Sequence, residues 1–117
     1  MFKSIGLALL ACSLAFCADV AGKWTASFET QIGTQNYIFE FKVMGDKVTG
    51  TAKSMLGEVQ ITEGTVKGDE ISFVENASFQ DMPLRIVYKG KINGDEIKFT
   101  RNVADMVMED LVAKRAK

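Results

Sequence analysis

The chain has 117 residues, enough for one domain, and its 14 basic and 15 acidic residues leave a net charge of −1. This balance excludes the broad basic surface that binds nucleic acid or an anionic membrane. The absence of histidine excludes Ser–His–Asp and Cys–His catalysis and disfavours most zinc sites. We therefore expect no nucleic-acid partner, no metal and no cofactor.

The N-terminal residues have the features of an export signal. Lys3 precedes an apolar run from Ile5 to Phe16, and small residues follow. The run is too short to cross a bilayer comfortably and has no stop-transfer flank, so we expect no transmembrane helix. The sequence predicts a signal peptide at 1–17.

Cleavage after Cys17 leaves 18–117 as a single secreted or periplasmic domain. Lipid attachment at Cys12 or Cys17 is the alternative. No cysteine follows Cys17, so the domain cannot form a disulfide and must draw its stability from a packed core.

Three short segments share one pattern, in which apolar residues flank Gly-Asp. They are "VMGDKV" (43–48), "VKGDEI" (66–71) and "INGDEI" (92–97). A calcium-binding EF-hand needs oxygen ligands spread over twelve residues, so these strings are too short for it. Glycine at the first central position of a two-residue turn takes a positive φ readily. The pattern therefore predicts three β-hairpins.

Counting outward by twos from each turn gives one consistent inward face. Its members are Tyr37, Phe39, Phe41, Val43, Val48, Gly50, Ala52, Ser54, Ile71, Phe73, Glu75, Leu84, Ile86, Tyr88, Gly90, Ile92, Ile97, Phe99, Arg101 and Val103. The alternation changes phase between Val59 and Val66, which predicts a β-bulge near Gly64.

Strands over 23–29 and 109–115 bring the number of predicted strands to eight. The end of the chain, 105–117, is also compatible with an amphipathic helix capped by Asp105. We favour a strand because Leu111 and Ala113 alternate and the first strand needs a partner. The predicted fold class is all-β, an eight-stranded antiparallel up-and-down (meander) barrel.

Gly22, Lys23 and Trp24 at the start of the first strand, with Lys114 and Arg115 at the end of the last, resemble the calycin superfamily of lipocalins, fatty-acid-binding proteins and avidins. The resemblance implies that Trp24 covers the closed end of the barrel and that Arg115, or Lys114, packs over it. The domain also resembles a group of small secreted bacterial proteins whose function is unassigned.

Connections in a meander alternate between the two ends of the barrel. The three Gly-Asp turns therefore lie at the same end as Trp24 and Arg115. The segments "TQIGTQN", "SMLGE", "NASFQDM" and "ADMVME" lie at the other end, where we predict longer loops and an open mouth. This placement is typical of lipocalins.

The mouth holds the candidate ligand site. Its apolar members are Ile32, Met55, Leu56, Phe79, Met82, Met106 and Met108. Methionine is adaptable and suits varied apolar partners, although these side chains could equally fold over the barrel and cap its core. Eight aromatic side chains on the inward face leave room only for a shallow pocket.

Charged residues on the inward face need a partner or a polar ligand. Glu75, Tyr88 and Arg101 lie on neighbouring strands, with Tyr37 nearby, and they form a candidate site for a ligand carboxylate, hydroxyl or amide. A structural ion pair between Glu75 and Arg101 is the alternative interpretation.

These features favour a non-enzymatic binding protein for a small apolar or mixed-polarity ligand. The alternative is an interaction module that contacts a protein or an extracellular polymer through its Met-rich loops. A two-carboxylate hydrolase, for example with Glu75 and Glu63 or Glu109, needs a defined separation and a raised pKa that the sequence does not indicate. The sequence leaves the oligomeric state open.

Overall fold

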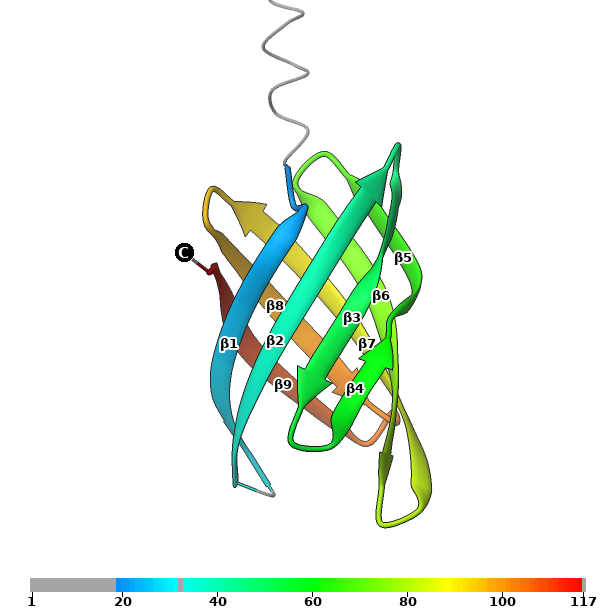
Figure 1. The fold of residues 1–117 in the computed structure, drawn as a ribbon. Coiled ribbons are helices and arrows are strands. Elements are labelled where there is room, and N and C mark those ends of the chain that lie inside the picture. Colours follow the sequence, from blue (N-terminus) through cyan, green and yellow to red (C-terminus); the bar gives the residue numbers. More distant parts are fainter. Residues whose placement is uncertain (1–18, 32, 117) are drawn as a thin grey trace, which may run out of the picture.

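The computed structural model describes residues 19–31 and 33–116. The predicted signal peptide, both cysteines and Ile32 lie outside these ranges. The described chain is all-β (Figure 1). Its strands are β1 (Gly22–Thr30), β2 (Gly33–Met44), β3 (Lys47–Ser54), β4 (Gly57–Gln60), β5 (Thr62–Lys67), β6 (Glu70–Phe79), β7 (Met82–Asn93), β8 (Glu96–Val103) and β9 (Val107–Arg115).

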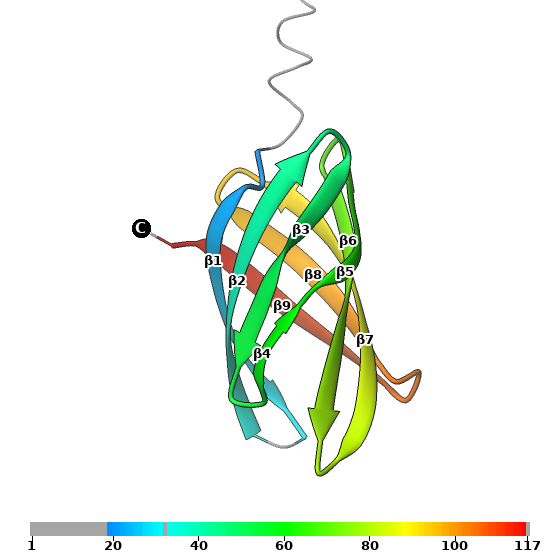
Figure 2. The ribbon, with the colours of Figure 1, turned by 45° about the vertical axis from the view of Figure 1, so that its right-hand side comes forward.

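The strands form one closed antiparallel up-and-down barrel. Each of them pairs with its sequence neighbour except across the β4–β5 junction, and β9 returns to pair with β1. The segments β4 and β5 both pair with β3, so together they occupy one of the eight positions around the barrel (Figure 2). The predicted eight-stranded barrel is confirmed, and 107–115 forms a strand rather than a helix.

The junction between β4 and β5 contains the predicted bulge. The pairing of β5 with β6 shifts register between Thr62 and Thr65, and Glu63 has a φ of 54°. A Cβ atom on Gly64 would lie 2.2 Å from the backbone oxygen of Val48. Glycine is therefore required here because the backbone of β3 approaches so closely.

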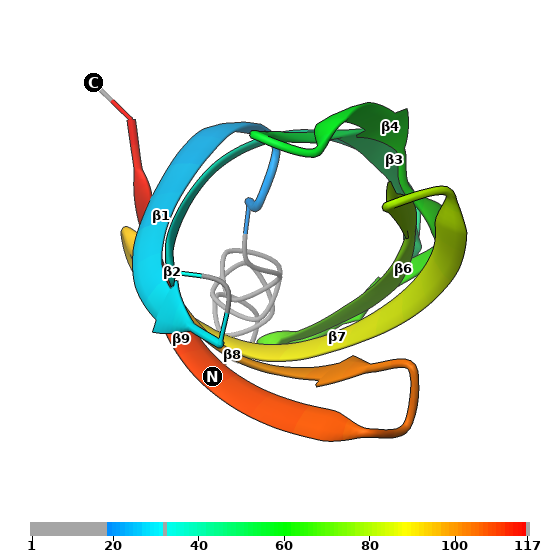
Figure 3. The same ribbon diagram turned by 90° about the horizontal axis from the view of Figure 1, so that it is seen from below.

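The first and last strands close the barrel over a short stretch. They pair only at Trp24–Arg115, Thr25–Lys114 and Ala26–Ala113. By contrast, β8 and β9 pair over eight residues. Between these three pairs and the mouth, residues 27–30 of β1 do not pair with residues 107–112 of β9 (Figure 3). We call this unpaired stretch of the barrel wall the seam.

The end of the barrel that holds the Gly-Asp turns is sealed. Gly45, Gly68 and Gly94 have φ values of 67°, 59° and 64°, which confirms the predicted turn geometry. Trp24 is fully buried, and its indole N–H donates to the backbone oxygen of Val20, at 2.9 Å.

Arg115 completes this seal from outside. Its guanidinium carbon lies 4.4 Å from the centre of the Trp24 ring, in cation–π contact. Its terminal nitrogens donate to the backbone oxygens of Ala21 and Asp19, and Nε donates to Asp95. The structure thus places Trp24 and Arg115 as the family resemblance implied.

The mouth has tighter turns than the sequence predicted. The strands extend further than expected: β2 begins at Gly33, three residues after the end of β1, and the other three turns at this end are only 55–56, 80–81 and 104–106. The prediction of longer loops is wrong because polar residues such as Thr34 and Asn76 continue the strand alternation on its solvent side. Four non-glycine turn residues here have positive φ: Gln80, Asp81, Ala104 and Asp105.

The core is largely aromatic. Ring contacts link Phe39 to Phe73, Tyr88 and Phe99, with centroids 5.6–5.9 Å apart. All eight predicted inward aromatics are buried: Trp24, Phe28, Tyr37, Phe39, Phe41, Phe73, Tyr88 and Phe99. Val43 is an exception to the predicted inward face, because it lies at the sealed rim and is 36% exposed.

Candidate functional site

A polar layer crosses the barrel between the aromatic core and the mouth. Neighbouring strands supply it, because Phe73 of β6 pairs with Tyr88 of β7, and Tyr88 pairs with Arg101 of β8. Alternation carries the inward face from Phe73 to Glu75, one step nearer the mouth. Tyr37 reaches the same layer from β2, across the barrel.

The two tyrosines bridge the charged residues of this layer. Tyr37 donates its hydroxyl to Glu75 Oε2 at 2.9 Å, and Tyr88 donates to Glu75 Oε1 at 2.8 Å. Arg101 Nη1 in turn donates to both tyrosine oxygens, at 3.2 Å for Tyr37 and 2.8 Å for Tyr88. The expected direct contact between Glu75 and Arg101 is therefore replaced by a bridge through two phenols.

Arg101 forms its ion pair with a carboxylate from the last strand. Arg101 Nε lies 2.7 Å from Glu109 Oε1, and both side chains are mostly buried. These residues are cross-strand partners in β8 and β9. The guanidinium carbon also lies 4.8 Å from the centre of the Phe28 ring. The last strand thus fixes Arg101 from one side and the tyrosines fix it from the other.

Burial shifts the ionisation of this layer. It raises the pKa of Glu75, although the hydrogen bonds from Tyr88 and Tyr37 and the charge of Arg101 oppose the change. Burial, followed by the charge of Glu75, also raises the pKa of both tyrosines, which keeps their hydroxyls protonated. For Arg101, burial lowers the pKa, but Tyr88, Glu109 and Tyr37 outweigh it and the pKa is raised overall.

A cavity of about 110 Å³ lies on the mouth side of Arg101. Polar residues of its lining are Thr30, Gln31, Gln35, Arg101 and Glu109. The apolar lining comes from Leu56, Phe79, Leu84, Ile86, Val103 and Val107. The site is therefore a small apolar space with its polar groups gathered on the β1, β2, β8 and β9 side.

Gln35 contributes the unusual atom of this cavity. The side chain is 1% exposed, and its Nε2 donates to the thioether sulfur of Met55 at 3.3 Å. Among the buried side-chain nitrogen and oxygen atoms of the described residues, only its Oε1 has no hydrogen-bond partner in the protein. A buried amide oxygen without a donor costs about 1–3 kcal/mol, so it needs an explanation.

The predicted site residues separate into three groups. Arg101 and Phe79 line the cavity, whereas Tyr37, Glu75 and Tyr88 lie beneath it and hold Arg101. Met55 contacts Gln35 from the rim. The remaining rim methionines are largely exposed and do not line the cavity: Met82, Met106 and Met108.

Sequence reasoning missed Gln35 as a site residue. The sequence of 30–36 predicts a loop, and the predicted inward face of this strand begins only at Tyr37. Two residues back from Tyr37, the same alternation places Gln35 inward, opposite Phe28. The sequence offers Glu109 only as a candidate hydrolase carboxylate, although its place two residues before Leu111 puts it on the inward face of β9.

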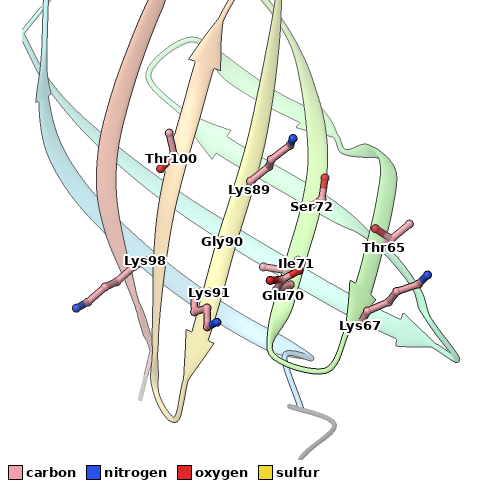
Figure 4. A pocket seen from close by; sticks show the side chains of 10 residues that line it. All are labelled: Thr65, Lys67, Glu70, Ile71, Ser72, Lys89, Gly90, Lys91, Lys98 and Thr100. Carbon is pink, nitrogen blue, oxygen red and sulfur yellow. The ribbon is translucent and has the colours of Figure 1, made fainter.

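Larger hollows exist on the outer wall but lack a buried polar group. Figure 4 shows a groove of about 500 Å³ over β5, β6, β7 and β8. Its long side chains are the lysines Lys67, Lys89, Lys91 and Lys98. Among the described residues, Lys91 alone of these four makes an ion pair, with Asp69 at 3.5 Å. The smaller mouth cavity is therefore the candidate site.

The described residues contain no group of three or more Cys, Asp or Glu side chains placed to hold a metal ion. Within the same residues, no helix is long and apolar enough to cross a membrane.

Comparisons with family models, with curated proteins and with solved structures find no match to this chain. The fold and the candidate site therefore rest on the residues and their geometry.

Proposed function

We propose that the protein is a secreted, non-enzymatic binding protein that holds a small molecule of mixed polarity in the mouth of its barrel. The unpaired Oε1 of buried Gln35, beside an apolar cavity of about 110 Å³, carries this proposal. A ligand that donates a hydrogen bond there would remove the cost of the unpaired oxygen. Retention of such an oxygen is easier to explain by binding than by stability.

The arrangement of the barrel supports the same function. The Trp24–Arg115 seal closes one end and the polar layer closes the interior beneath the cavity, so access is from the mouth. The residues around Trp24 resemble those of calycin barrels, and a barrel of that type is compatible with ligand binding at the mouth. Export through the segment 1–17 would place the site outside the cytoplasm.

The size of the cavity limits the ligand. Typical drug-sized pockets measure about 300–1,000 Å³, and an engineered cavity of about 150 Å³ accommodates benzene. A space of about 110 Å³ therefore fits a small molecule or the end of a longer one.

The rim methionines favour a second candidate, a contact surface for another macromolecule. Met55, Met82, Met106 and Met108 are between 63% and 82% exposed. Large exposed apolar side chains gathered at one end are typical of contact surfaces. On this alternative, the rim binds a protein and the cavity stays empty.

Fragment binding followed by NMR distinguishes the two candidates. Compounds of five to eight non-hydrogen atoms, roughly the size that fits, should shift resonances of Leu84, Ile86 and Val103, which line the cavity. Shifts confined to the rim methionines would favour the contact surface. If no fragment shifts the cavity resonances up to its solubility limit, the ligand-binding function is wrong.

A further inference from the structure

The hydrogen bonds within the polar layer determine which donors and acceptors remain free to bind a ligand. Arg101 Nη1 has two hydrogens, and both are donated, one to Tyr37 and one to Tyr88. Each tyrosine therefore donates its single hydroxyl hydrogen to Glu75. With Glu75 ionised, every donor of this set has an acceptor, so the tyrosines offer no hydrogen to a ligand.

Both carboxylates of this set are already paired before a ligand arrives, and with Glu75 ionised the two carboxylates and the one guanidinium carry a single net negative charge. Glu109 contacts Arg101 directly, and Glu75 reaches it through the two phenols. A ligand carboxylate in the cavity would meet Glu109 with no unpaired cation to offset the repulsion. A ligand ammonium would meet the Arg101 guanidinium in the same lining, and the one carboxylate there, Glu109, is already paired with that guanidinium. Burying either charge without a partner is costly, so the lining disfavours both.

The two buried polar side chains of the cavity lining, Gln35 and Arg101, each keep one unused group. Gln35 Oε1 is an acceptor without a donor. Arg101 uses Nε and Nη1, whereas its Nη2 makes no hydrogen bond to any residue in the described ranges. These two buried side chains thus offer one acceptor and one donor group, and the rest of the polar lining comes from the less buried Thr30, Gln31 and Glu109. A matching ligand must both donate and accept a hydrogen bond.

We propose that the mouth cavity selects a neutral group that donates and accepts hydrogen bonds, a primary amide or an alcohol, on a short apolar chain. The amide N–H or alcohol O–H is donated to Gln35, and the ligand oxygen accepts from Arg101. The chain packs against Leu84, Ile86 and Val103. In this scheme Arg101 and Gln35 are binding residues, while Tyr37, Tyr88, Glu75 and Glu109 are positioning residues. This assignment rests on the proposed ligand-binding function.

Four probes of similar size test the selectivity of the cavity. Butyramide donates and accepts, methyl propanoate only accepts, and butyrate and butylammonium carry opposite charges. NMR titration of the purified protein should give butyramide a dissociation constant about tenfold or more below that of methyl propanoate, because a buried acceptor without a donor is strongly disfavoured. Both charged probes should bind more weakly than butyramide.

Variants of Gln35 identify the residue responsible. In Gln35→Leu, the dissociation constants of butyramide and methyl propanoate should agree to within about twofold, since the unpaired acceptor is gone. Gln35→Met, which keeps the length of the side chain, should give the same result if the leucine variant does not fold. Gln60→Leu is the matched control, because Gln60 is exposed on the outer wall, and it should keep the preference of the wild type.

The outcomes distinguish failure of the neutral donor–acceptor assignment from failure of the ligand-binding function itself. Binding of butyrate, butylammonium or methyl propanoate as tightly as butyramide would overturn the neutral donor–acceptor assignment and leave the mouth as a binding site. A preference for butyramide that persists in Gln35→Leu would also overturn it. Absence of binding by all four probes would overturn both the assignment and the ligand-binding function.

Discussion

The two ends of the barrel each use an arginine, but in different surroundings. At the sealed end, Arg115 covers Trp24 and donates to backbone oxygens near the surface. At the mouth, Arg101 is 6% exposed and lies between a carboxylate and two phenols. The sealed end is completed by the chain itself, whereas the mouth retains an unpaired oxygen on Gln35.

The turns show the same contrast. Glycine occupies the positive-φ position of all three Gly-Asp turns. At the mouth, non-glycine residues such as Ala104 and Gln80 have this conformation, with φ near 53°. Left-handed backbone costs a non-glycine residue about 1–2 kcal/mol. Two of the four mouth turns, 80–81 and 104–106, therefore give up stability that the Gly-Asp turns keep, whereas Gly33 and Gly57 take positive φ beside the other two.

Substitution of Trp24 tests the sealed end of the barrel. Trp24→Ala should lower the free energy of unfolding by about 3–5 kcal/mol, because it empties a fully buried aromatic site. Urea denaturation measures the change. Trp24→Phe, which keeps much of the volume, serves as the milder variant. A loss below about 1 kcal/mol in the alanine variant would show that Trp24 does not seal the barrel.

Exchange of each arginine for methionine compares the ends directly. Arg101→Met should cost about 3–5 kcal/mol, because it leaves Glu109 mostly buried without its partner. Arg115→Met should cost about 1–2 kcal/mol, because its partner Asp95 is exposed and only the ring contact and the carbonyl bonds are lost. Equal costs, measured by denaturation, would contradict the contrast between the two ends.

The polar layer should respond to pH through Glu75. Its raised pKa means that the folded protein binds this proton more tightly than the unfolded chain. The resulting stability is complete below the ordinary pKa of 4.5 and is lost as the pH rises through the raised value. As the pH rises from 4.5 through the raised pKa of Glu75, the Glu75→Gln variant should therefore lose less stability than the wild type.

Denaturation midpoints of both proteins between about pH 4 and about pH 8 measure the effect. Glu58→Gln, which changes an exposed carboxylate on β4, is the control and should follow the wild type. Parallel curves for the wild type and Glu75→Gln would show that Glu75 titrates as it does in the unfolded chain.

The smallest expected effect concerns the turns. Ala104→Gly should raise stability by about 1 kcal/mol, since glycine adopts positive φ without strain. Gly94→Ala should lower it by about the same amount for the opposite reason. The Cβ that Gly94→Ala adds meets no neighbour, because it would lie in open space. Thermal unfolding of the two variants checks the signs, and a loss in Ala104→Gly would exclude strain at this turn.

Local patterns explain which features were predictable from sequence. The Gly-Asp turns set the hairpin register, and the register then placed Tyr88, Arg101 and the aromatic core on one face. The seal of Trp24 by Arg115 was implied by resemblance and agrees with their pairing in β1 and β9.

Other features depend on contacts that spacing does not specify. The strand pairing gave the separation of Glu75 and Arg101 but not the reach of the tyrosines, which come between them. Gln35 was missed because a polar residue near a turn looks like loop sequence until the strand is known to extend there. The cavity depends on how side chains from several strands fill the mouth, which no single segment encodes.

The seam between β1 and β9 has a mechanical consequence. Backbone hydrogen bonds hold these strands together only near the sealed end, so the two strands can move apart toward the mouth without breaking any ladder between them. The width of the entrance is then governed by side chains that span the gap, above all Arg101 with Glu109 and Phe28. The β1–β9 closure thus depends on backbone pairing near the sealed end and on side chains near the mouth, where Arg101 and Glu109 both line the cavity and span the gap.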